Sequence, residues 1–467
     1  MEIITLKKVD EVFMYVDCDK GLARELFDFF CFNVPNAKFM PSVKNGWWDG
    51  KIRLFSMDKK QIYIGLMPYV IEFCKERGYD VQGIQDILGE KDLSEHEEFV
   101  QSLGLPFSPR DYQLEAFNTA KTYGRQLLLS PTASGKSLII YLLTRYFDKK
   151  TVVIVPTTSL VEQMTQDFID YGYKHDICKI YSGQPVFDSP ITVTTWQSFS
   201  KAPKDVIKSF DVVIGDEAHT MKANVCKGIL EKMNETAIRI GTTGTLDGTE
   251  VHRLQLEGLF GPVKKVITTA ELMESGAVAN LKIDCIILKH KKQEKGSYQD
   301  EMDYLVSCPE RNNFIVNLVS TLKGNTLVLF QYVEKHGAVL HDMLKDRVPE
   351  LHYVHGSTVT EDREAIRGIV EQADDHVILA SYGTFSTGVN IKKIDNVIFA
   401  SPSKSRIRNL QSIGRALRKA DNKTEAKLYD IADDLGCNNH TLKHLKERVS
   451  IYSEEQFDYE IIQLRIQ

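Results

Sequence analysis

The chain has 467 residues, of which 43% are hydrophobic and 26% are charged, and its formal net charge is −6. These fractions are typical of folded globular domains and exclude a disordered, collagen-like or coiled-coil chain. At roughly 150 residues per domain, the length predicts about three domains. The slight excess of acidic over basic residues gives no overall argument for a partner that is a polyanion.

The eight cysteines are scattered, without a Cys-x-x-Cys pair or a paired histidine spacing that would hold zinc. We therefore expect reduced thiols. The first residues, Met-Glu-Ile-Ile-Thr, lack the basic start and apolar stretch of a secretion signal, and no apolar run approaches the roughly 18 residues that span a bilayer. These features predict a protein of the cytoplasm.

Residues 1–95 differ in character from the rest and predict a small α+β domain. Residues 37–61 hold six basic and two acidic side chains, whereas residues 1–35 hold four basic and seven acidic ones. The run Trp47 to Lys51 reads as a turn with aromatic rings beside positive charge, which suits a nucleic-acid surface. The candidate contacts are Lys44, Lys51 and Arg53. In the alternative interpretation one tryptophan is in the core and the lysines are only solvated.

An acidic stretch, residues 86–98, is predicted to form a helical linker to the rest of the chain. Beyond it, short apolar runs alternate with stretches of helical periodicity, and this pattern occurs twice. It predicts two α/β domains with mostly parallel sheets, over residues 96–265 and 266–467. Weaker periodicity between residues 267 and 323 suggests a domain boundary and a flexible insertion. The expected strands are 126–129, 151–155, 211–214, 237–240, 326–330, 376–380, 396–400 and 427–431, and the expected helices include 137–147, 159–171, 335–344 and 361–372.

The run Ser130-Pro-Thr-Ala-Ser-Gly-Lys-Ser137 follows the first of these strands and precedes a helix. Backbone N–H groups of such a loop point at phosphates, Lys136 would reach the β and γ phosphates of ATP, and Ser137 would hold Mg²⁺. Ser130 stands where the usual pattern has glycine, so the first turn of the loop could have a different backbone conformation. The other candidate binding residues are Thr132, Ala133, Ser134 and Gly135.

Asp216 and Glu217 follow the strand at 211–214, at the sheet edge where α/β proteins bind ligands. Asp216 can complete the Mg²⁺ shell, and Glu217 can orient and deprotonate the attacking water. A solvated turn is the alternative interpretation of this acidic pair. It is disfavoured by the phosphate loop that precedes the pair.

Gln411-Ser-Ile-Gly-Arg-Ala-Leu-Arg418 places Arg415 and Arg418 one helical turn apart. Two guanidinium groups on one face suit phosphate oxygens, and an arginine supplied from a second domain can stabilise the transferred phosphoryl group. The alternative is a solvated basic helix. We take Gln411, Arg415 and Arg418 as candidate catalytic residues.

Residues 105–450 resemble the superfamily 2 helicases that carry a DEAH sequence. The matching segments, in order, are Arg110–Gln113, the phosphate loop, Val155–Leu160, Thr194–Ser198, Asp216–His219, Thr243–Thr245, Phe330–Tyr332, Ser386–Asn390 and Gln411–Arg418. The resemblance implies two tandem RecA-like motor domains, with ATP and Mg²⁺ as cofactors. It implies adenine reading by Arg110 and Gln113 and further nucleotide contacts from Gly388 and Asn390. The implied contacts to a nucleic-acid strand are Pro156, Thr157, Thr194, Thr195, Gln197 and Thr387, although local loop hydrogen bonding is the alternative for the threonines.

Ser401 to Arg408 and the start of the chain further resemble phage helicases of recombination, repair and replication. This resemblance implies a DNA motor that acts on forks, junctions and RNA–DNA hybrids in the host-cell cytoplasm, with an N-terminal module like those that bind double-stranded RNA. We expect a monomer. Two alternatives stay open: the motor subunit of a larger DNA-processing complex, and an ATP-dependent switch that grips nucleic acid without unwinding it.

Overall fold

The computed structural model describes residues 3–466 except 36, 89–95, 182–187, 222, 235–236, 247, 385–390, 392, 404, 406–408, 411, 415–416 and 419–422. The chain divides into two compact units. One holds Met1–Ser130 and Gly135–Val266, and the other holds Pro131–Ser134 and Ile267–Gln467. No helix within the described residues is long and apolar enough to cross a bilayer.

The chain begins with a mixed five-stranded sheet in the order β5-β6-β2-β1-β7. Apolar side chains alternate along its strands, so that Ile4 and Leu6 on β1 and Met14 and Val16 on β2 are buried together against α1 and α3. The elements are β1 (Ile3–Lys8), β2 (Phe13–Asp17), α1 (Lys20–Phe29), β5 (Phe55–Ser56), β6 (Gln61–Tyr63), η2 (Ile64–Leu66), α3 (Met67–Glu76), β7 (Asp80–Gln82) and α4 (Ile84–Leu88). A separate two-stranded ribbon, β3 (Cys31–Asn33) with β4 (Lys51–Arg53), carries η1 (Ala37–Phe39) and α2 (Pro41–Lys44).

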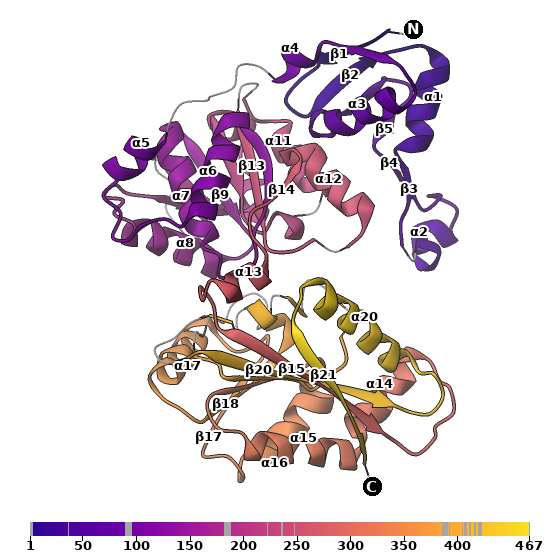
Figure 1. Cartoon of the computed structure of the whole chain (residues 1–467), viewed down its shortest axis with the longest axis vertical. Coiled ribbons are helices and arrows are strands. Elements are labelled where there is room, and N and C mark those ends of the chain that lie inside the picture. Colours follow the sequence, from indigo (N-terminus) through magenta and orange to yellow (C-terminus); the bar gives the residue numbers. More distant parts are fainter. Residues whose placement is uncertain are drawn as a thin grey trace. The chain divides into compact units, whose positions relative to one another are not determined.

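The first unit also contains a seven-stranded sheet, all parallel, in the order β10-β11-β9-β12-β13-β8-β14. Helices α6, α7 and α8 cover one face and α11 and α12 the other (Figure 1). The strands are β8 (Arg125–Leu129), β9 (Thr151–Val155), β10 (Cys178–Ile180), β11 (Ile191–Thr195), β12 (Val212–Gly215), β13 (Ile238–Thr243) and β14 (Val263–Lys265). The helices are α5 (Glu97–Ser102), α6 (Asp111–Tyr123), α7 (Lys136–Phe147), α8 (Thr158–Asp170), α9 (Trp196–Phe199), α10 (Lys204–Lys208), η3 (Ala218–Thr220), α11 (Ala223–Leu230) and α12 (Glu250–Phe260).

The mixed sheet packs directly against this parallel-sheet domain. Glu11 Oε2 accepts hydrogen bonds from Arg125 Nη2 (3.0 Å) and Arg239 Nη1 (3.3 Å), and the Arg239 side chain is fully buried. Tyr69 donates to Glu257 Oε2 at 2.8 Å. At Gly65, an added Cβ would lie only 2.0 Å from the Glu257 carbonyl oxygen, so glycine is required for this close approach.

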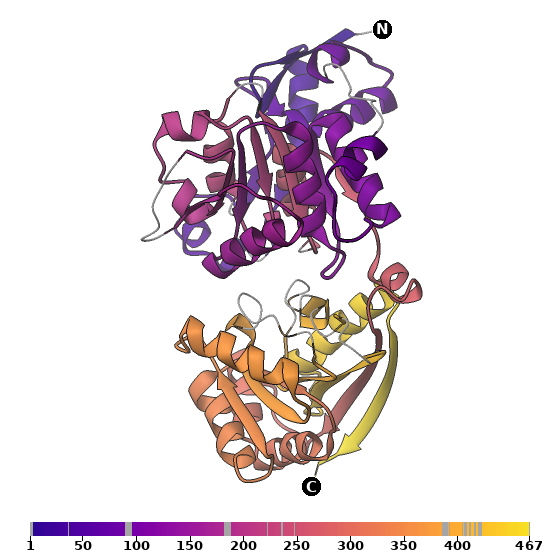
Figure 2. The same cartoon turned by 90° about the vertical axis from the view of Figure 1, so that its left-hand side faces the viewer.

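The second unit holds another seven-stranded parallel sheet, in the order β17-β18-β16-β19-β20-β15-β21. Helices lie on both faces of this sheet, with α15 and α16 on one face and α20 on the other (Figure 1, Figure 2). The strands are β15 (Asn280–Lys289), β16 (Thr326–Phe330), β17 (Glu350–Val354), β18 (His376–Ser381), β19 (Asn396–Phe399), β20 (Glu425–Asp434) and β21 (Asp458–Arg465). The helical elements are α13 (Thr269–Glu274), α14 (Tyr298–Ser307), α15 (Pro309–Thr321), η4 (Val333–Gly337), α16 (Ala338–Leu344), α17 (Thr360–Gln372) and α20 (His440–Glu454).

The predicted fold class is confirmed: two RecA-like parallel sheets follow a mixed α+β sheet. One expectation is wrong. Residues 267–323 were expected to hold a flexible insertion, but they include β15, which pairs with β20 and β21 along its length, and α15, which packs on the sheet. The connection between β15 and α14 covers residues 290–297. All eight cysteines are free thiols, as expected.

Candidate functional site

The phosphate loop lies between β8 and α7, and α7 begins at Lys136. Lys136 Nζ donates to the Ser130 carbonyl oxygen at 3.2 Å and lies 3.4 Å from Glu217 Oε1. Gly135 has φ +80°, and an added Cβ would lie 2.3 Å from Gln113 Nε2. The glycine therefore serves both a left-handed turn and a close side-chain approach.

The loop residues themselves form a tight turn. Ser134 donates through its hydroxyl to the Pro131 carbonyl oxygen at 2.7 Å, and Ala133 adopts φ +68°. Ser130 is fully buried, and its N–H donates to the Thr243 carbonyl oxygen on β13 at 2.9 Å. Ser130 is not among the residues with positive φ, so the backbone here does not require the glycine of the usual pattern.

Asp216 follows β12 at the carboxyl edge of the sheet and is held on both sides. Its N–H donates to the Ile154 carbonyl oxygen at 2.8 Å, and its Oδ1 accepts from Thr242 Oγ1 (2.7 Å) and from the Glu217 N–H (2.9 Å). The pKa of Asp216 is raised to about 6, mainly because the side chain is buried and also because the negative charge of Glu217 lies beside it. The backbone of Asp216 is thus held by β9, and its carboxylate is held by Thr242 of β13.

Glu217 has φ +47°, in the left-handed region. Its Oε2 accepts from the Gly244 N–H at 3.4 Å and lies 3.3 Å from His219 Nδ1. Burial opposes ionisation of this side chain, but the charges of Lys136 and His219 outweigh it and hold the pKa of Glu217 below its usual value. An ionised carboxylate in a strained backbone position is suited to act as a base.

The predicted magnesium ligands provide oxygen donors of the kind this ion prefers. Asp216 offers a buried carboxylate, and both of its hydrogen bonds fall on Oδ1. Ser137 offers a hydroxyl at the start of α7, where it shares a 2.8 Å hydrogen bond with the Tyr171 hydroxyl. The donor set therefore fits Mg²⁺, although the pattern of the phosphate loop gave no indication of Tyr171.

Sequence reasoning missed Thr242 and the partner of His219. His219 Nδ1 lies 2.6 Å from Thr243 Oγ1, which also donates to the Thr245 carbonyl oxygen at 2.9 Å. These contacts link the DEAH segment to the end of β13. The Thr-Gly-Thr sequence at 243–245 is the signal that could have found the histidine contact, whereas Thr242 follows only from the pairing of β12 with β13.

The predicted adenine readers lie together at the start of α6. The Arg110 N–H donates to Gln113 Oε1 at 2.9 Å, and Arg110 Nη1 donates to the Tyr112 hydroxyl at 2.8 Å. The Gln113 side chain is buried beside Gly135. The structure thus brings Gln113 to the phosphate loop.

Several predicted residues of the second unit lie outside the described part of the chain. These are Thr387, Gly388, Asn390, Gln411 and Arg415. Arg418 is described and half-buried.

The predicted strand contacts of the first unit have local partners. Thr157 and Thr195 accept N-cap hydrogen bonds from Leu160 and Ser198, at the starts of α8 and α9. Thr194 is fully buried and donates to the Ile180 carbonyl oxygen at 2.7 Å. Its side chain is therefore not accessible to a nucleic-acid strand, and we do not include it among the proposed contacts. Pro156 is half-buried and Gln197 is exposed, at the carboxyl ends of β9 and β11.

The basic region of the first domain forms an exposed projection on the β3–β4 ribbon. Lys44 and Lys51 are exposed, and Trp47 is 82% exposed. Trp48 is half-buried, and its Nε1 donates to the Lys51 carbonyl oxygen at 2.9 Å. Arg53 is exposed but forms an ion pair with Asp49.

Three family models match successive parts of the chain. Residues 3–83 match the UvsW DNA helicase N-terminal model, residues 106–248 the type III restriction enzyme res subunit, and residues 310–420 the helicase conserved C-terminal domain. The match to the res subunit model contains the phosphate loop and the DEAH segment.

Similarity to individual proteins and to crystal structures agrees with these family models. The ATP-dependent DNA helicase UvsW of Enterobacteria phage T4 is 33% identical over 483 residues, covering 95% of this chain and 96% of the relative. The DNA 3′-5′ translocase XPB2 of Sulfurisphaera tokodaii is 22% identical over 386 residues, covering 73% of this chain and 86% of that relative. The crystal structure of T4 UvsW aligns over 100% of both chains with 31% identity and a TM-score of 0.53. The chain belongs to the superfamily 2 ATP-dependent DNA helicases of the UvsW type.

Proposed function

We propose that this chain is an ATP-driven DNA motor that unwinds or remodels branched DNA, including forks, junctions and RNA–DNA hybrids. Its reactions would serve recombination, repair and replication. The observation that carries the proposal is the cluster of Lys136, Asp216 and Glu217 at the carboxyl edge of the first parallel sheet, with Lys136 Nζ 3.4 Å from Glu217 Oε1. This cluster joins a phosphate-binding loop to a general base, as hydrolysis of a nucleoside triphosphate requires.

Each residue of the cluster has a distinct proposed role. Lys136 and the loop N–H groups bind the β and γ phosphates, and Glu217, ionised because its pKa is low, orients and deprotonates water. Ser137 and Asp216 would hold Mg²⁺, which when bound supplies positive charge to the phosphate oxygens. Arg110 and Gln113 would bind adenine. From the second unit we propose nucleotide contacts by Gly388, Asn390, Gln411, Arg415 and Arg418.

We further propose three functional domains: an accessory module of residues 1–95 and motor domains of residues 96–265 and 266–467. The accessory module would bind nucleic acid through Lys44, Lys51 and Arg53, next to the exposed Trp47. The ends of β9 and β11, with Pro156, Thr157, Thr195 and Gln197, would contact strand phosphates, and Thr387 would do so from the second motor domain. Such contacts position a strand without reading its sequence.

The similarity to the ATP-dependent DNA helicase UvsW of phage T4 supports this proposal, as does the similarity to the DNA 3′-5′ translocase XPB2 of Sulfurisphaera tokodaii. We propose a monomer in the cytoplasm of an infected host cell. The match of residues 106–248 to the res subunit of type III restriction enzymes favours a second candidate, a motor subunit of a larger DNA-processing complex. In that case the chain would couple ATP hydrolysis to DNA without unwinding it.

Unwinding assays with four substrates test the proposal directly. ATP-dependent strand separation is measured side by side on forked DNA, a four-way junction, an RNA–DNA hybrid and duplex RNA. The proposal predicts activity on the two branched DNAs and the hybrid, with little on duplex RNA. DNA-stimulated ATP hydrolysis without separation of any substrate would favour the second candidate, and ATP hydrolysis insensitive to DNA would refute both.

A further inference from the structure

A cluster of potential metal ligands lies on the second parallel sheet. Edge strand β17 pairs in parallel with β18, and Glu350 lies opposite His376 in the register. Because side chains alternate along a strand, Glu350 and His352 share one face with His376. Leu351, which lies between Glu350 and His352, and Val377, which follows His376, pack into the core with α15 and α16, so the three residues face the other side of the sheet.

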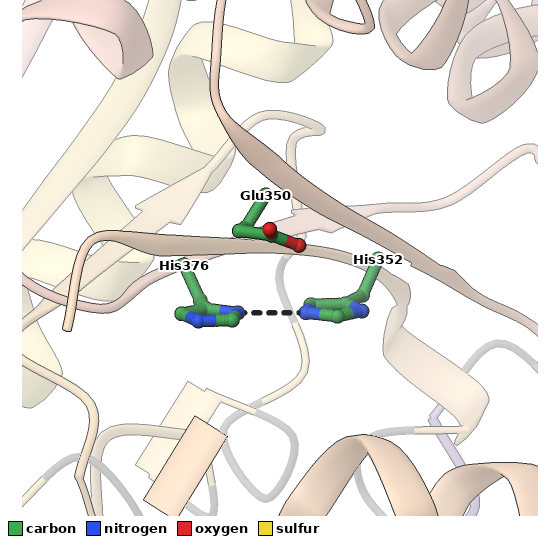
Figure 3. Close-up of side chains that lie close together, drawn as sticks. All are labelled: Glu350, His352 and His376. Atoms are coloured by element: carbon green, nitrogen blue, oxygen red, sulfur yellow. Dashed lines mark hydrogen bonds between the residues drawn. The ribbon is translucent and has the colours of Figure 1, made fainter. Parts of the chain in front are cut away.

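The three side chains converge on one point. His352 Nε2 lies 2.9 Å from His376 Nδ1, and the two rings are parallel to within 1°. Figure 3 shows the rings edge to edge with the Glu350 carboxylate beside the bond between them. One ligand atom from each residue lies within 4.8 Å of the others, and no second group of this kind occurs among the described residues.

The surroundings hold part of this arrangement in place. His376 is only 6% exposed, whereas His352 is half-buried and Glu350 is exposed, so the cluster opens to solvent on one side. The His376 N–H donates to Asn325 Oδ1 at 3.0 Å, and Asn325 Nδ2 donates to the carbonyl oxygens of Val370, Ala373 and Lys393. The start of β18 is therefore fixed by a buried asparagine.

We propose that Glu350, His352 and His376 form a binding site for a divalent transition metal ion of the Zn²⁺ class. Two imidazole nitrogens and a carboxylate oxygen suit Zn²⁺ better than Mg²⁺ or Ca²⁺, which prefer oxygen alone. A tetrahedral ion with Zn–N bonds of about 2.0 Å needs its nitrogens roughly 3.3 Å apart. Metal binding would therefore replace the hydrogen bond between the rings, and both rings would turn so that these nitrogens point at the ion instead of at each other. Water would complete the fourth position.

The location assigns this ion a structural role. Glu350 and His376 are the first residues of β17 and β18, at the amino edge of the sheet, whereas ligand chemistry in parallel sheets occurs at the carboxyl edge. A bound ion would join the edge strand to its neighbour across the connection that contains α17. Metal binding would thus stabilise the second unit without taking part in ATP hydrolysis.

Metal titration of the full-length chain tests the site. After removal of any histidine tag, Zn²⁺ binding is measured by equilibrium dialysis in excess Mg²⁺, and Co²⁺ binding by its visible absorption. We expect one equivalent bound per chain, a tetrahedral Co²⁺ spectrum and a higher thermal unfolding midpoint with Zn²⁺. Both Glu350→Gln and His352→Gln should weaken binding about tenfold or more, because each removes a ligand.

His175→Gln, at an exposed histidine of the other unit, is the matched control and should bind as the unsubstituted chain does. His352 is half-buried, so its substitution is less disruptive than one at His376, and an unchanged circular dichroism spectrum verifies the fold. The absence of a bound equivalent would overturn the proposal. So would binding that His352→Gln leaves intact, because the ion would then sit on cysteines or other histidines.

Discussion

Lys136 Nζ lies 3.4 Å from Glu217 Oε1, and both side chains are largely removed from solvent. Glu217 also neighbours Asp216, whose pKa is raised to about 6, and the positive charge of Lys136 favours the ionised form of both carboxylates. We propose that the same ammonium binds the phosphates of ATP. The ionisation of the proposed base therefore depends on the residue that we propose to bind the substrate.

Replacing this lysine should therefore remove two functions at once. Lys136→Ala is expected to lower DNA-stimulated ATP hydrolysis by about 100-fold or more, because phosphate stabilisation and the charge that keeps Glu217 ionised are both lost. Turnover is measured by phosphate release with and without DNA. Lys149→Ala, at an exposed lysine beyond the end of α7, should retain full activity. Equal activity of the two variants would rule out the proposed role.

Glu217→Gln should separate binding from hydrolysis. The amide keeps the shape of the side chain but cannot accept a proton, so kcat is expected to fall by about 100-fold or more while ATP affinity changes only a few-fold. Binding of a fluorescent ATP analogue and single-turnover hydrolysis provide the two readouts. A parallel loss of both would show that Glu217 is needed for binding or folding rather than for proton transfer.

Glu11 is expected to hold the accessory domain against the first motor domain. Burial lowers the pKa of Arg239 to about 9 despite this carboxylate, and Glu11→Gln would remove the carboxylate that is paired with Arg125 and Arg239. Breaking a buried pair in this way costs about 3 kcal/mol. The urea unfolding midpoint, followed by tryptophan fluorescence, should fall. Asp17→Asn, in an exposed pair with Lys7, should leave it unchanged.

His336 should make the second unit sensitive to acid. It is fully buried with Nδ1 3.0 Å from Ser401 Oγ, and burial, aided by the charge of Arg311, lowers its pKa to about 3. Below the unfolded value of about 6.5 the unfolded chain binds this proton and the folded chain does not. The contribution is fully present above pH 6.5 and is lost as pH falls toward 3, with a slope of up to about 1.4 kcal/mol per pH unit.

The measurement is urea unfolding between pH 4 and pH 8. His336→Gln should reduce the pH slope by about one proton, whereas His175→Gln, at an exposed site, should retain it. Identical slopes for the unsubstituted chain and His336→Gln would show that His336 is protonated in the folded state.

The basic projection should contribute to DNA affinity in a salt-dependent way. Replacing Lys44, Lys51 and Arg53 together by alanine is expected to weaken binding and to flatten its dependence on salt, because fewer phosphates release counterions. Arg53 should contribute less than the lysines because Asp49 already neutralises it. Fluorescence anisotropy at several salt concentrations measures both effects. The control is a double alanine variant of Lys20 and Lys75, at exposed sites on α1 and α3. An equal loss of DNA affinity in the control would contradict the assignment of Lys44, Lys51 and Arg53 to DNA binding.

Much of the parallel-sheet core was predictable because its inner strands are continuous apolar runs. β8, β9, β12, β16 and β18 all lie where short apolar segments predicted them. β15 was missed because Lys282 and Asp284 interrupt its apolar residues, and the edge strand β21 was missed because none of its residues is fully buried. Edge and amphipathic strands carry a weaker signal than fully buried ones.

The chemistry of the site was partly predictable for a related reason. Lys136 and Ser137 are adjacent, as are Asp216 and Glu217, and each pair follows a strand. The supporting contacts depend on which strands are neighbours: Thr242 reaches Asp216 only because β13 pairs with β12. The Glu11 pair and the His352–His376 pair join segments far apart in the chain, which no local pattern indicates.

Strand separation of a forked DNA by the unsubstituted chain and by Glu217→Gln tests the central claim most directly. We predict that the unsubstituted chain separates the strands when ATP is present. We predict that Glu217→Gln binds ATP and DNA but releases no phosphate and separates no strands. Separation of the fork by Glu217→Gln at the unsubstituted rate would contradict the account, as would failure of the unsubstituted chain to couple hydrolysis to the fork.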